Sequence, residues 1–173
     1  GKRFRPLFAL IGFIGANGKL TEHVYKATGA LEFLQASALI HDDLMDSSDS
    51  RRGKPSVHKR FATLHGDVFG SSAAILIGDL ALVWSEEALN QSGISAEQLL
   101  NVNPINAVMR SELMSGQFLD VFEQKQSDFS IERALKIARY KSGKYSIERP
   151  LHFGAALALP KNLDDFLNIY SEY

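Results

Sequence analysis

The chain has 173 residues, of which 45% are hydrophobic, with 19 basic and 20 acidic side chains and a formal net charge of −1. This composition supports one domain with a sizeable core, and the balanced charge argues against a general nucleic-acid-binding protein. The sequence has no cysteine, which excludes disulfides and thiolate metal sites and is compatible with the cytoplasm. No apolar run approaches the ~20 residues that span a bilayer, so we expect no transmembrane segment.

The chain begins without a methionine and stops within an expected helix, so we expect a single domain over residues 1–173 that is incomplete at both ends. Pro6 suits the first turn of the first predicted helix. Lys2 and Arg5 flank this helix start and are candidates to hold phosphate there, or are simply part of a solvated basic terminus. Thr21 is a suitable N-cap for the second helix.

The second predicted helix carries the apolar run 31–40 and ends in His-Asp-Asp-Leu-Met-Asp at positions 41 to 46. Residues four apart share a helix face, so Asp42 and Asp46 point the same way, with Asp43 close by. Carboxylates placed in this way repel one another unless a cation lies between them. Mg2+ is a natural partner, because it binds one or two protein carboxylates and completes its shell with water and phosphate oxygens. Standing alone, an acidic helix end is more often solvated surface.

Two arginines, Arg51 and Arg52, follow the acidic motif and suit bidentate contact with phosphate. The joint occurrence of carboxylates and guanidinium groups indicates a diphosphate site, whereas the arginine pair alone indicates a solvated charge run. Pro55 and Ser56 can start a short helix with His58, which is either a second phosphate contact or a surface histidine.

The stretch 67–91 predicts a long apolar helix in which Asp79 needs a partner, and we expect a structural acid held by a neighbouring helix. A capping box at 95–98 starts the next helix, which Pro104 is predicted to interrupt before it resumes at residue 105. Strand-like alternation is scarce, so the predicted fold is all-α.

On the resumed helix, Gln117 and Asp120 share a face and can point at a common cavity. A further helix is predicted over residues 131–140, and it is expected to end or kink by Pro150. Lys141 and Ser142 lie near this expected break. Lysines in such a place can bind phosphate as point charges, but more commonly face water.

Five motifs, namely GKRFRP, HDDLMD with the following RRGKPSVH, LIGDLAL, GQFLD and KSGKYS, occur in the order found in trans-polyprenyl diphosphate synthases. The chain resembles this family from its start to about residue 150. The resemblance implies a bundle of antiparallel helices around a central cavity, a homodimer, and head-to-tail transfer of an allylic group to isopentenyl diphosphate. The family's second aspartate-rich motif is absent here, so we expect either an incomplete chain or a defective relative, and the chain as it stands is not assumed to be active.

The resemblance also implies roles for individual residues. Asp42 and Asp46 would hold Mg2+ on the allylic diphosphate, with Asp43 assisting and about three ions in each site. The allylic diphosphate would contact Arg51, Gln117, Lys141 and Ser142. The isopentenyl diphosphate would contact Lys2, Arg5, Arg52 and His58.

The same helix that carries the acidic motif bears on product length. With ~1.5 Å of rise per residue, Ala38 and Ser37 lie roughly 6 to 8 Å below Asp42, and Leu34 lies about 12 Å below it. In the family, the positions four and five before the first aspartate limit the growing chain, and both are small here. We therefore expect a product longer than farnesyl diphosphate, with geranylgeranyl diphosphate as the first choice. Alternatively, the two residues are small only to permit close helix packing.

Two other functions are compatible with parts of the sequence. His41 and Asp42, with His23 upstream, are also typical of a metal-dependent phosphohydrolase of the HD type. That enzyme requires further histidine and aspartate ligands, and it does not require the arginine pair. The second alternative is a non-catalytic subunit that keeps the synthase fold and pairs with an active enzyme.

Overall fold

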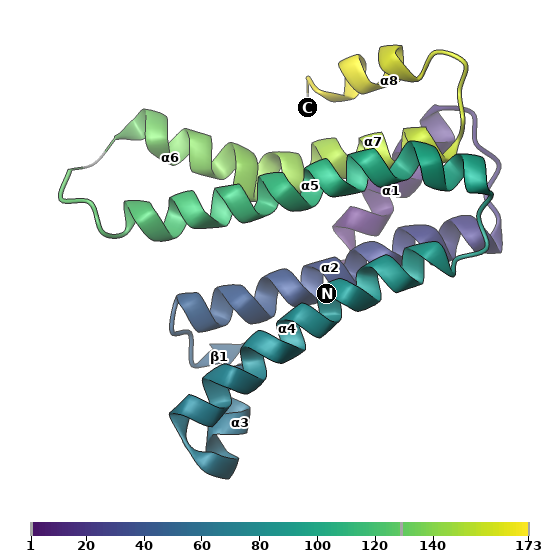
Figure 1. Cartoon of the computed structure of the whole chain (residues 1–173). Helices are drawn as coiled ribbons and strands as arrows, with labels where there is room; N and C mark the ends of the chain where they lie inside the picture. Colours follow the sequence, from purple (N-terminus) through teal and green to yellow (C-terminus); the bar gives the residue numbers. More distant parts are fainter. Residues whose placement is uncertain (1, 129, 173) are drawn as a thin grey trace. The chain divides into compact units, whose positions relative to one another are not determined.

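In a computed structural model that describes residues 2–128 and 130–172, the chain divides into two units, one made of residues 29–89 and the other of residues 1–28 and 90–173. We call the first the aspartate unit and the second the lysine unit. Apart from one hairpin of two-residue strands, the regular elements of the described ranges are helices (Figure 1). The all-α class is confirmed, whereas the single domain and its central cavity stay predictions.

The elements follow the chain in the order α1 (Phe4–Gly15), α2 (Glu22–Met45), β1 (Ser50–Arg51), β2 (Lys54–Pro55), α3 (Val57–His65), α4 (Asp67–Asn90), α5 (Ala96–Glu123), α6 (Ile131–Ile137), η1 (Ala138–Glu148), α7 (Arg149–Leu157) and α8 (Leu163–Tyr170). Most helix starts agree with the sequence signals. Thr21 Oγ1 accepts a hydrogen bond from the backbone N–H of Val24 at 3.3 Å, as expected of an N-cap. Ser95 and Gln98 form both hydrogen bonds of the predicted capping box.

In the aspartate unit, α2 and α4 lie side by side and antiparallel, with α3 and the hairpin near the C-terminal end of α2 (Figure 1). Near one end of the pair, the ring of Phe33 meets that of Trp84 edge-on, with centroids 6.3 Å apart. Near the other, His41 Nε2 lies 3.2 Å from the carbonyl oxygen of Ile75. These contacts hold the last turns of α2, which carry the acidic motif, against α4.

Asp79 has the partner that was expected on a neighbouring helix. Its Oδ1 lies 3.5 Å from Nε2 of His41 on α2, although the side chain of Asp79 is 62% exposed. By length and composition α4 is apolar enough to cross a membrane, although a core helix of a soluble protein passes the same test. The expected lack of a transmembrane segment therefore stays a prediction.

In the lysine unit, α1 packs against α7, and α5 runs antiparallel to the continuous rod formed by α6, η1 and α7 (Figure 1). Glycine is required at position 154, where α7 meets α1, since a Cβ there would overlap the carbonyl oxygen of Ala9. Around it, Phe153, Ala155 and Ala156 are fully buried. The core of this unit therefore lies along α7.

The predicted interruption at Pro104 is wrong, because α5 continues through it for 28 residues. A proline inside a helix removes one backbone hydrogen bond and costs about 3 kcal/mol. The buried face of α5 runs past this point through Val102, Asn106 and Met109, all at most 2% exposed. Burial of this stripe offsets the local cost, so tertiary packing overrides the sequence signal.

The predicted break between residue 140 and Pro150 is also wrong. α6 passes directly into η1, a π-helix of 11 residues, and η1 passes into α7. Pro150 is the second residue of α7, directly after the π-helix. Lys141 and Ser142 consequently lie on a helix rather than beside a break.

Candidate functional site

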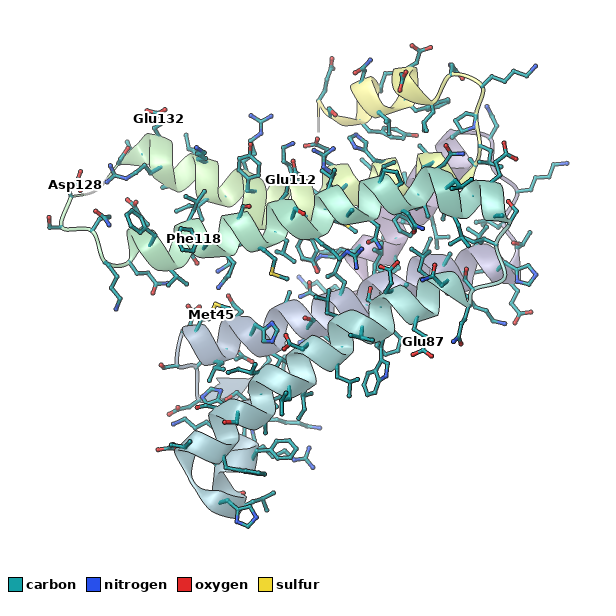
Figure 2. All side chains as sticks on the ribbon, viewed as in Figure 1. Met45, Glu87, Glu112, Phe118, Asp128 and Glu132 are labelled. Atoms are coloured by element: carbon teal, nitrogen blue, oxygen red, sulfur yellow. The ribbon has the colours of Figure 1, made fainter. Side chains whose placement is uncertain are left out.

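Three carboxylates and one guanidinium gather where α2 ends, at the end that Figure 2 marks by Met45. Asp42 and Asp43 lie in the last turn of the helix, and Asp46 follows it, with its N–H donating to the carbonyl oxygen of Asp42 at 2.9 Å. Asp43 is buried at 3% exposure, Asp42 is partly exposed and Asp46 is exposed. We call these three residues and Arg51 the acidic cluster.

The hairpin brings Arg51 back to the helix end. Its Nε donates to Asp43 Oδ1 at 2.9 Å, its Nη2 contacts the same oxygen, and Nη2 also donates to Asp42 Oδ2 at 3.3 Å. The hydrogen bonds that Arg51 donates to Asp43 outweigh the effect of burial and raise the pKa of Arg51. Arg51, expected as a diphosphate contact, is therefore held by Asp43, the residue expected to assist the two metal ligands.

The acidic cluster fits a hard divalent cation. Asp42 and Asp46 are one helical turn apart, both reach solvent, and three carboxylates against one guanidinium give the cluster a formal charge of −2. Mg2+ commonly binds one or two protein carboxylates and keeps several waters. Within residues 2–128 and 130–172, no group of three or more His, Cys, Asp or Glu side chains surrounds a common point. The described residues thus offer a partial ligand set that water or phosphate oxygens would complete.

The other two candidates of the aspartate unit follow Arg51. Arg52 is exposed and has a φ of 56°, next to Gly53 with a φ of 75°, as the tight hairpin turn requires. His58 is buried at 8% exposure, and its Nδ1 lies 3.2 Å from Ser56 Oγ. His58 is therefore not a surface histidine, and its role as a phosphate contact stays a prediction.

The lysine unit holds the basic residues of the first motif. Lys2 is exposed, with its Nζ 5.6 Å from the ring centroid of Phe4. Arg5 is half-buried: its Nη2 donates to Ser146 Oγ at 2.8 Å, and its Cζ lies 4.0 Å from the ring centroid of Tyr145. Arg5 is thus fixed by η1, whereas Lys2 projects into solvent.

A second part of this unit brings α5 and η1 together. Lys141 Nζ lies 2.5 Å from Asp120 Oδ2, and Gln117 is half-buried one turn before Asp120. The two helices approach closely because a Cβ on Gly116 would lie 2.7 Å from the backbone nitrogen of Lys141. Ser142 is exposed. The shared face of Gln117 and Asp120 was visible in the sequence, but the pairing with Lys141 was not.

The residues expected to limit product length lie on the middle of α2. Leu34 and Ser37 are fully buried, and Ala38 is half-buried. Ser37 Oγ has no hydrogen-bond partner among the described residues. Burial fits close packing and a tunnel wall equally, so the wall assignment stays a prediction.

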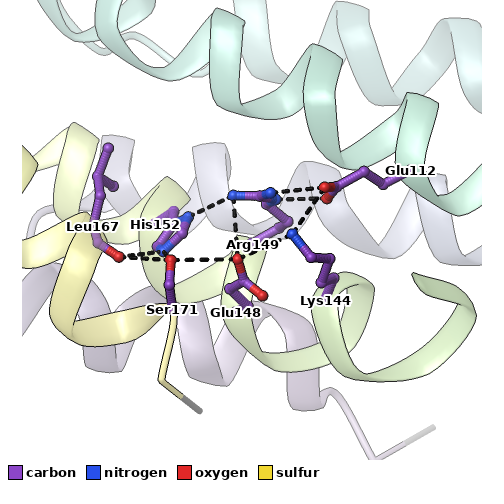
Figure 3. Close-up of polar contacts among 7 residues, drawn as sticks. All are labelled: Glu112, Lys144, Glu148, Arg149, His152, Leu167 and Ser171. Carbon is purple, nitrogen blue, oxygen red and sulfur yellow. Dashed lines mark hydrogen bonds and ion pairs between the residues drawn. The ribbon is translucent and has the colours of Figure 1, made fainter. Parts of the chain in front are cut away.

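A polar network that the sequence analysis missed crosses the lysine unit (Figure 3). Arg149 donates to both oxygens of Glu112 at 2.6 and 2.7 Å. Lys144 Nζ donates to Glu112 at 3.0 Å and to Glu148 at 3.4 Å. Burial raises the pKa of Glu112, but the hydrogen bonds from Arg149 and Lys144 outweigh it and lower this pKa below its ordinary value. We call these four residues and His152 the Glu112 network.

His152 extends the network to α8 (Figure 3). It is 2% exposed, with Nδ1 3.0 Å from Arg149 Nη1 and Nε2 2.9 Å from the carbonyl oxygen of Leu167. A guanidinium can only donate, so Nδ1 accepts and Nε2 carries the hydrogen. Burial, followed by the charge of Arg149, lowers the pKa of His152. A neutral histidine therefore ties α8 to α7.

The geometry gives the HD-type phosphohydrolase no support. His23 Nδ1 lies 3.0 Å from the carbonyl oxygen of Ser92, and His41 Nε2 lies 3.2 Å from that of Ile75. The imidazole of His23 contacts a backbone carbonyl, and that of His41 contacts a backbone carbonyl and the exposed carboxylate of Asp79. The further histidine and aspartate cluster that such an enzyme requires is not found in the described parts of the chain.

Comparisons with known proteins point in one direction. The sequence matches the family model described as "Polyprenyl synthetase" over residues 1–173. It is 33% identical over 170 residues to the geranylgeranyl diphosphate synthase of Cyanophora paradoxa, covering 95% of this chain and 53% of the relative. It is also 33% identical over 161 residues to the short chain isoprenyl diphosphate synthase of Methanocaldococcus jannaschii, covering 91% and 45%.

Among solved structures, one of geranylgeranyl pyrophosphate synthase from Corynebacterium glutamicum, complexed with isoprenyl diphosphate and magnesium, is 42% identical with a TM-score of 0.90. The match covers 98% of this chain and 52% of that one. The chain spans about half the length of the curated relatives it matches.

Proposed function

Because the chain belongs to the polyprenyl synthetase family, we propose that the protein is a prenyltransferase that joins isopentenyl diphosphate to an allylic diphosphate, head to tail, and makes a longer all-trans prenyl diphosphate. The observation that carries this proposal is the acidic cluster, in which Asp42 and Asp43 meet Arg51 at the end of α2. Carboxylates for a divalent cation and a guanidinium for phosphate are the groups that a diphosphate leaving group requires.

Mg2+ is the proposed metal, with Asp42 and Asp46 as its ligands and about three ions in each site. The related structure complexed with magnesium supports the choice of metal. When bound, the metal would neutralise the diphosphate. In this chain, Arg51 would add positive charge at the acidic cluster, and the family resemblance also assigns Lys141, Gln117 and Ser142 to the allylic diphosphate.

The reaction replaces one carbon–oxygen bond by a carbon–carbon bond and moves one proton to the released diphosphate. The carbon–oxygen bond of the allylic substrate breaks, the double bond of isopentenyl diphosphate attacks the allylic cation, and a proton is then lost to the released diphosphate. Cationic groups favour this ionisation because negative charge develops on the leaving group. The second substrate would be held by a separate set of residues, namely Lys2, Arg5, Arg52 and His58.

The proposed product is geranylgeranyl diphosphate. Small side chains at Ser37 and Ala38 would let the tail pass below Asp42, and Leu34 would lie further along the same wall. Relatives named geranylgeranyl diphosphate synthases support this choice.

The protein is further proposed to act as a homodimer in the cytoplasm. Exposed apolar side chains on α4 support the dimer, among them Leu76 at 68%, Val83 at 60% and Trp84 at 44% exposure. Sedimentation equilibrium should give twice the mass of one chain, and a monomer at micromolar concentration would contradict the dimer.

The direct test supplies the protein with labelled isopentenyl diphosphate and, in turn, dimethylallyl, geranyl or farnesyl diphosphate, with Mg2+ or with a chelator. We expect longer prenyl diphosphates with Mg2+ and none with the chelator. Phosphate release without isopentenyl diphosphate, and without chain elongation, would favour the hydrolase. Binding of isopentenyl diphosphate without any turnover would favour the non-catalytic subunit.

A further inference from the structure

On the basis of this prenyltransferase function, we propose that Tyr145 and Ser146 are positioning residues that present Arg5 to the diphosphate of isopentenyl diphosphate. The π-helix η1 would then position groups for both substrates, because it also carries Lys141. Neither Tyr145 nor Ser146 would contact substrate.

The contacts around Arg5 fix its guanidinium in two respects. The cation–π contact with Tyr145, at 4.0 Å from Cζ to the ring centroid, holds the group over the face of the ring. The hydrogen bond from Nη2 to Ser146 Oγ, at 2.8 Å, sets its rotation over the ring. A guanidinium binds phosphate through a planar fork of donors, so its position and its rotation must both be defined. The contacts with Tyr145 and Ser146 therefore organise Arg5 before the substrate arrives.

The support behind Arg5 is rigid. Tyr145 is 2% exposed, so its ring has little freedom to turn away. Helix α1, which carries Arg5, packs against both α7 and η1. An arginine on the first turn of α1 is therefore held from the side by a segment 140 residues further along the chain.

The π-helix η1 brings Lys141, which is expected to bind the allylic diphosphate, near Ser146, which holds Arg5. Hydrogen bonds in a π-helix join residues five apart, so Lys141 and Ser146 are one turn apart on η1. Lys141 is held by Asp120 at 2.5 Å, just as Arg5 is held by Ser146. One short segment thus orders a cation expected on the allylic side and a cation expected on the isopentenyl side.

The test uses three variants at the two proposed positions, made in the whole protein, and one control elsewhere. Ser146→Ala removes the hydrogen bond, Tyr145→Leu removes the ring, and Tyr145→Phe keeps the ring. We expect the first two to raise the KM for isopentenyl diphosphate by about tenfold and to leave the KM for the allylic substrate within about twofold. Tyr145→Phe should behave like the parent, as should Ser72→Ala, which removes an exposed hydroxyl bonded only to its own helix.

A double variant separates positioning from general packing. If Ser146 acts through Arg5, then adding Ser146→Ala to Arg5→Ala should cause no further rise in the KM for isopentenyl diphosphate. Equal rises for both substrates, or fully additive effects in the double variant, would overturn the proposal.

A measurement without turnover distinguishes failure of this inference from failure of the proposed function. The Nε–H of Arg5 can be followed by nitrogen relaxation in the substrate-free protein. We expect a rigid group in the parent and in Tyr145→Phe, and a mobile one in Ser146→Ala and Tyr145→Leu. If Arg5 stays rigid in both of the latter, the positioning role is wrong whether or not the protein transfers prenyl groups. If Tyr145→Leu fails to fold, the mobility of Arg5 in Ser146→Ala tests the positioning role by itself.

Discussion

The acidic cluster and the Glu112 network use the same chemical groups and balance them differently. The acidic cluster sets three carboxylates against one guanidinium, for a formal charge of −2. The Glu112 network sets Glu112 and Glu148 against Lys144 and Arg149, for a formal charge of zero, with a neutral His152 at its edge. A network whose charges cancel holds helices together, whereas a cluster with excess negative charge is suited to attract a cation.

Solvent access follows the same division. In the Glu112 network, the side chains of Glu112, Lys144 and Arg149 are 17%, 11% and 16% exposed. In the acidic cluster, Arg51 is 39% exposed and Asp46 lies on the surface. A ligand can therefore reach the acidic cluster, but it would have to break buried ion pairs to enter the Glu112 network.

Asp42→Asn should have the largest effect, and it should be on catalysis. Loss of a metal ligand acts on the transition state, and ~4 kcal/mol there is about a thousandfold in turnover. The thermal midpoint should be unchanged, because the cluster is not expected to hold the fold. Asp49→Asn, an exposed carboxylate just outside the cluster, is the control. Near-normal product formation by Asp42→Asn at saturating Mg2+ would rule out the metal assignment.

Glu112→Ala should show the opposite pattern. Removing one partner leaves Arg149 and Lys144 poorly compensated in a buried setting, which costs about 3 kcal/mol of unfolding free energy. Turnover per folded molecule should change little. Urea unfolding of this variant beside Glu97→Ala, an exposed acid on the same helix, measures the difference. Equal losses in the two variants would show that the Glu112 network does not stabilise the fold.

The pH dependence of stability should separate His152 from the carboxylates. Because its folded-state pKa lies below the ordinary 6.5, the unfolded state binds more protons as the pH falls through this value. Stability should therefore decline below about pH 6.5. Glu112, whose pKa is lowered, should lose its contribution only below its ordinary 4.5.

Thermal midpoints of the parent and of His152→Gln, measured between pH 7.5 and pH 5, test this directly. The parent should lose more stability over that range than the variant, because glutamine offers an acceptor and a donor without titrating. Parallel curves would show that His152 does not titrate as expected.

Ala38→Phe should change the product with little effect on rate or stability. Ala38 lies one turn before Asp42, so a ring there would shorten the space available to the growing tail. Product chromatography should show a shift to shorter prenyl chains. Ala36→Phe is the control, since it lies about 200° around the helix from Ala38. The parent product in parent proportions from Ala38→Phe would remove the argument for product length.

The sequence was most informative where the residues of a site lie close together along the chain. Asp42, Asp43, Asp46 and Arg51 lie within ten residues, so helical spacing and one hairpin suffice to bring them together. The N-cap at Thr21 was likewise predictable, because its hydrogen bond joins residues three apart.

The spacing of the residues along the chain could not reveal that the carboxylate of Asp43 pairs with the guanidinium of Arg51. That ion pair depends on how far the hairpin turns, which Arg52 and Gly53 set through their positive φ angles. The pairing of Lys141 with Asp120 and that of Arg5 with Ser146 depend on contacts between helices, across 21 and 141 residues of chain.

The sequence by itself determined the all-α class, most of the helix starts and the place of the acidic motif, because these depend on periodicity and on hydrogen bonds between residues a few positions apart. Only the tertiary structure decided that α5 passes Pro104, that residues 138–148 form a π-helix, and that Glu112 meets Arg149. At Pro104, burial of the α5 face outweighs a local cost of about 3 kcal/mol, and such burial leaves no local sequence signal.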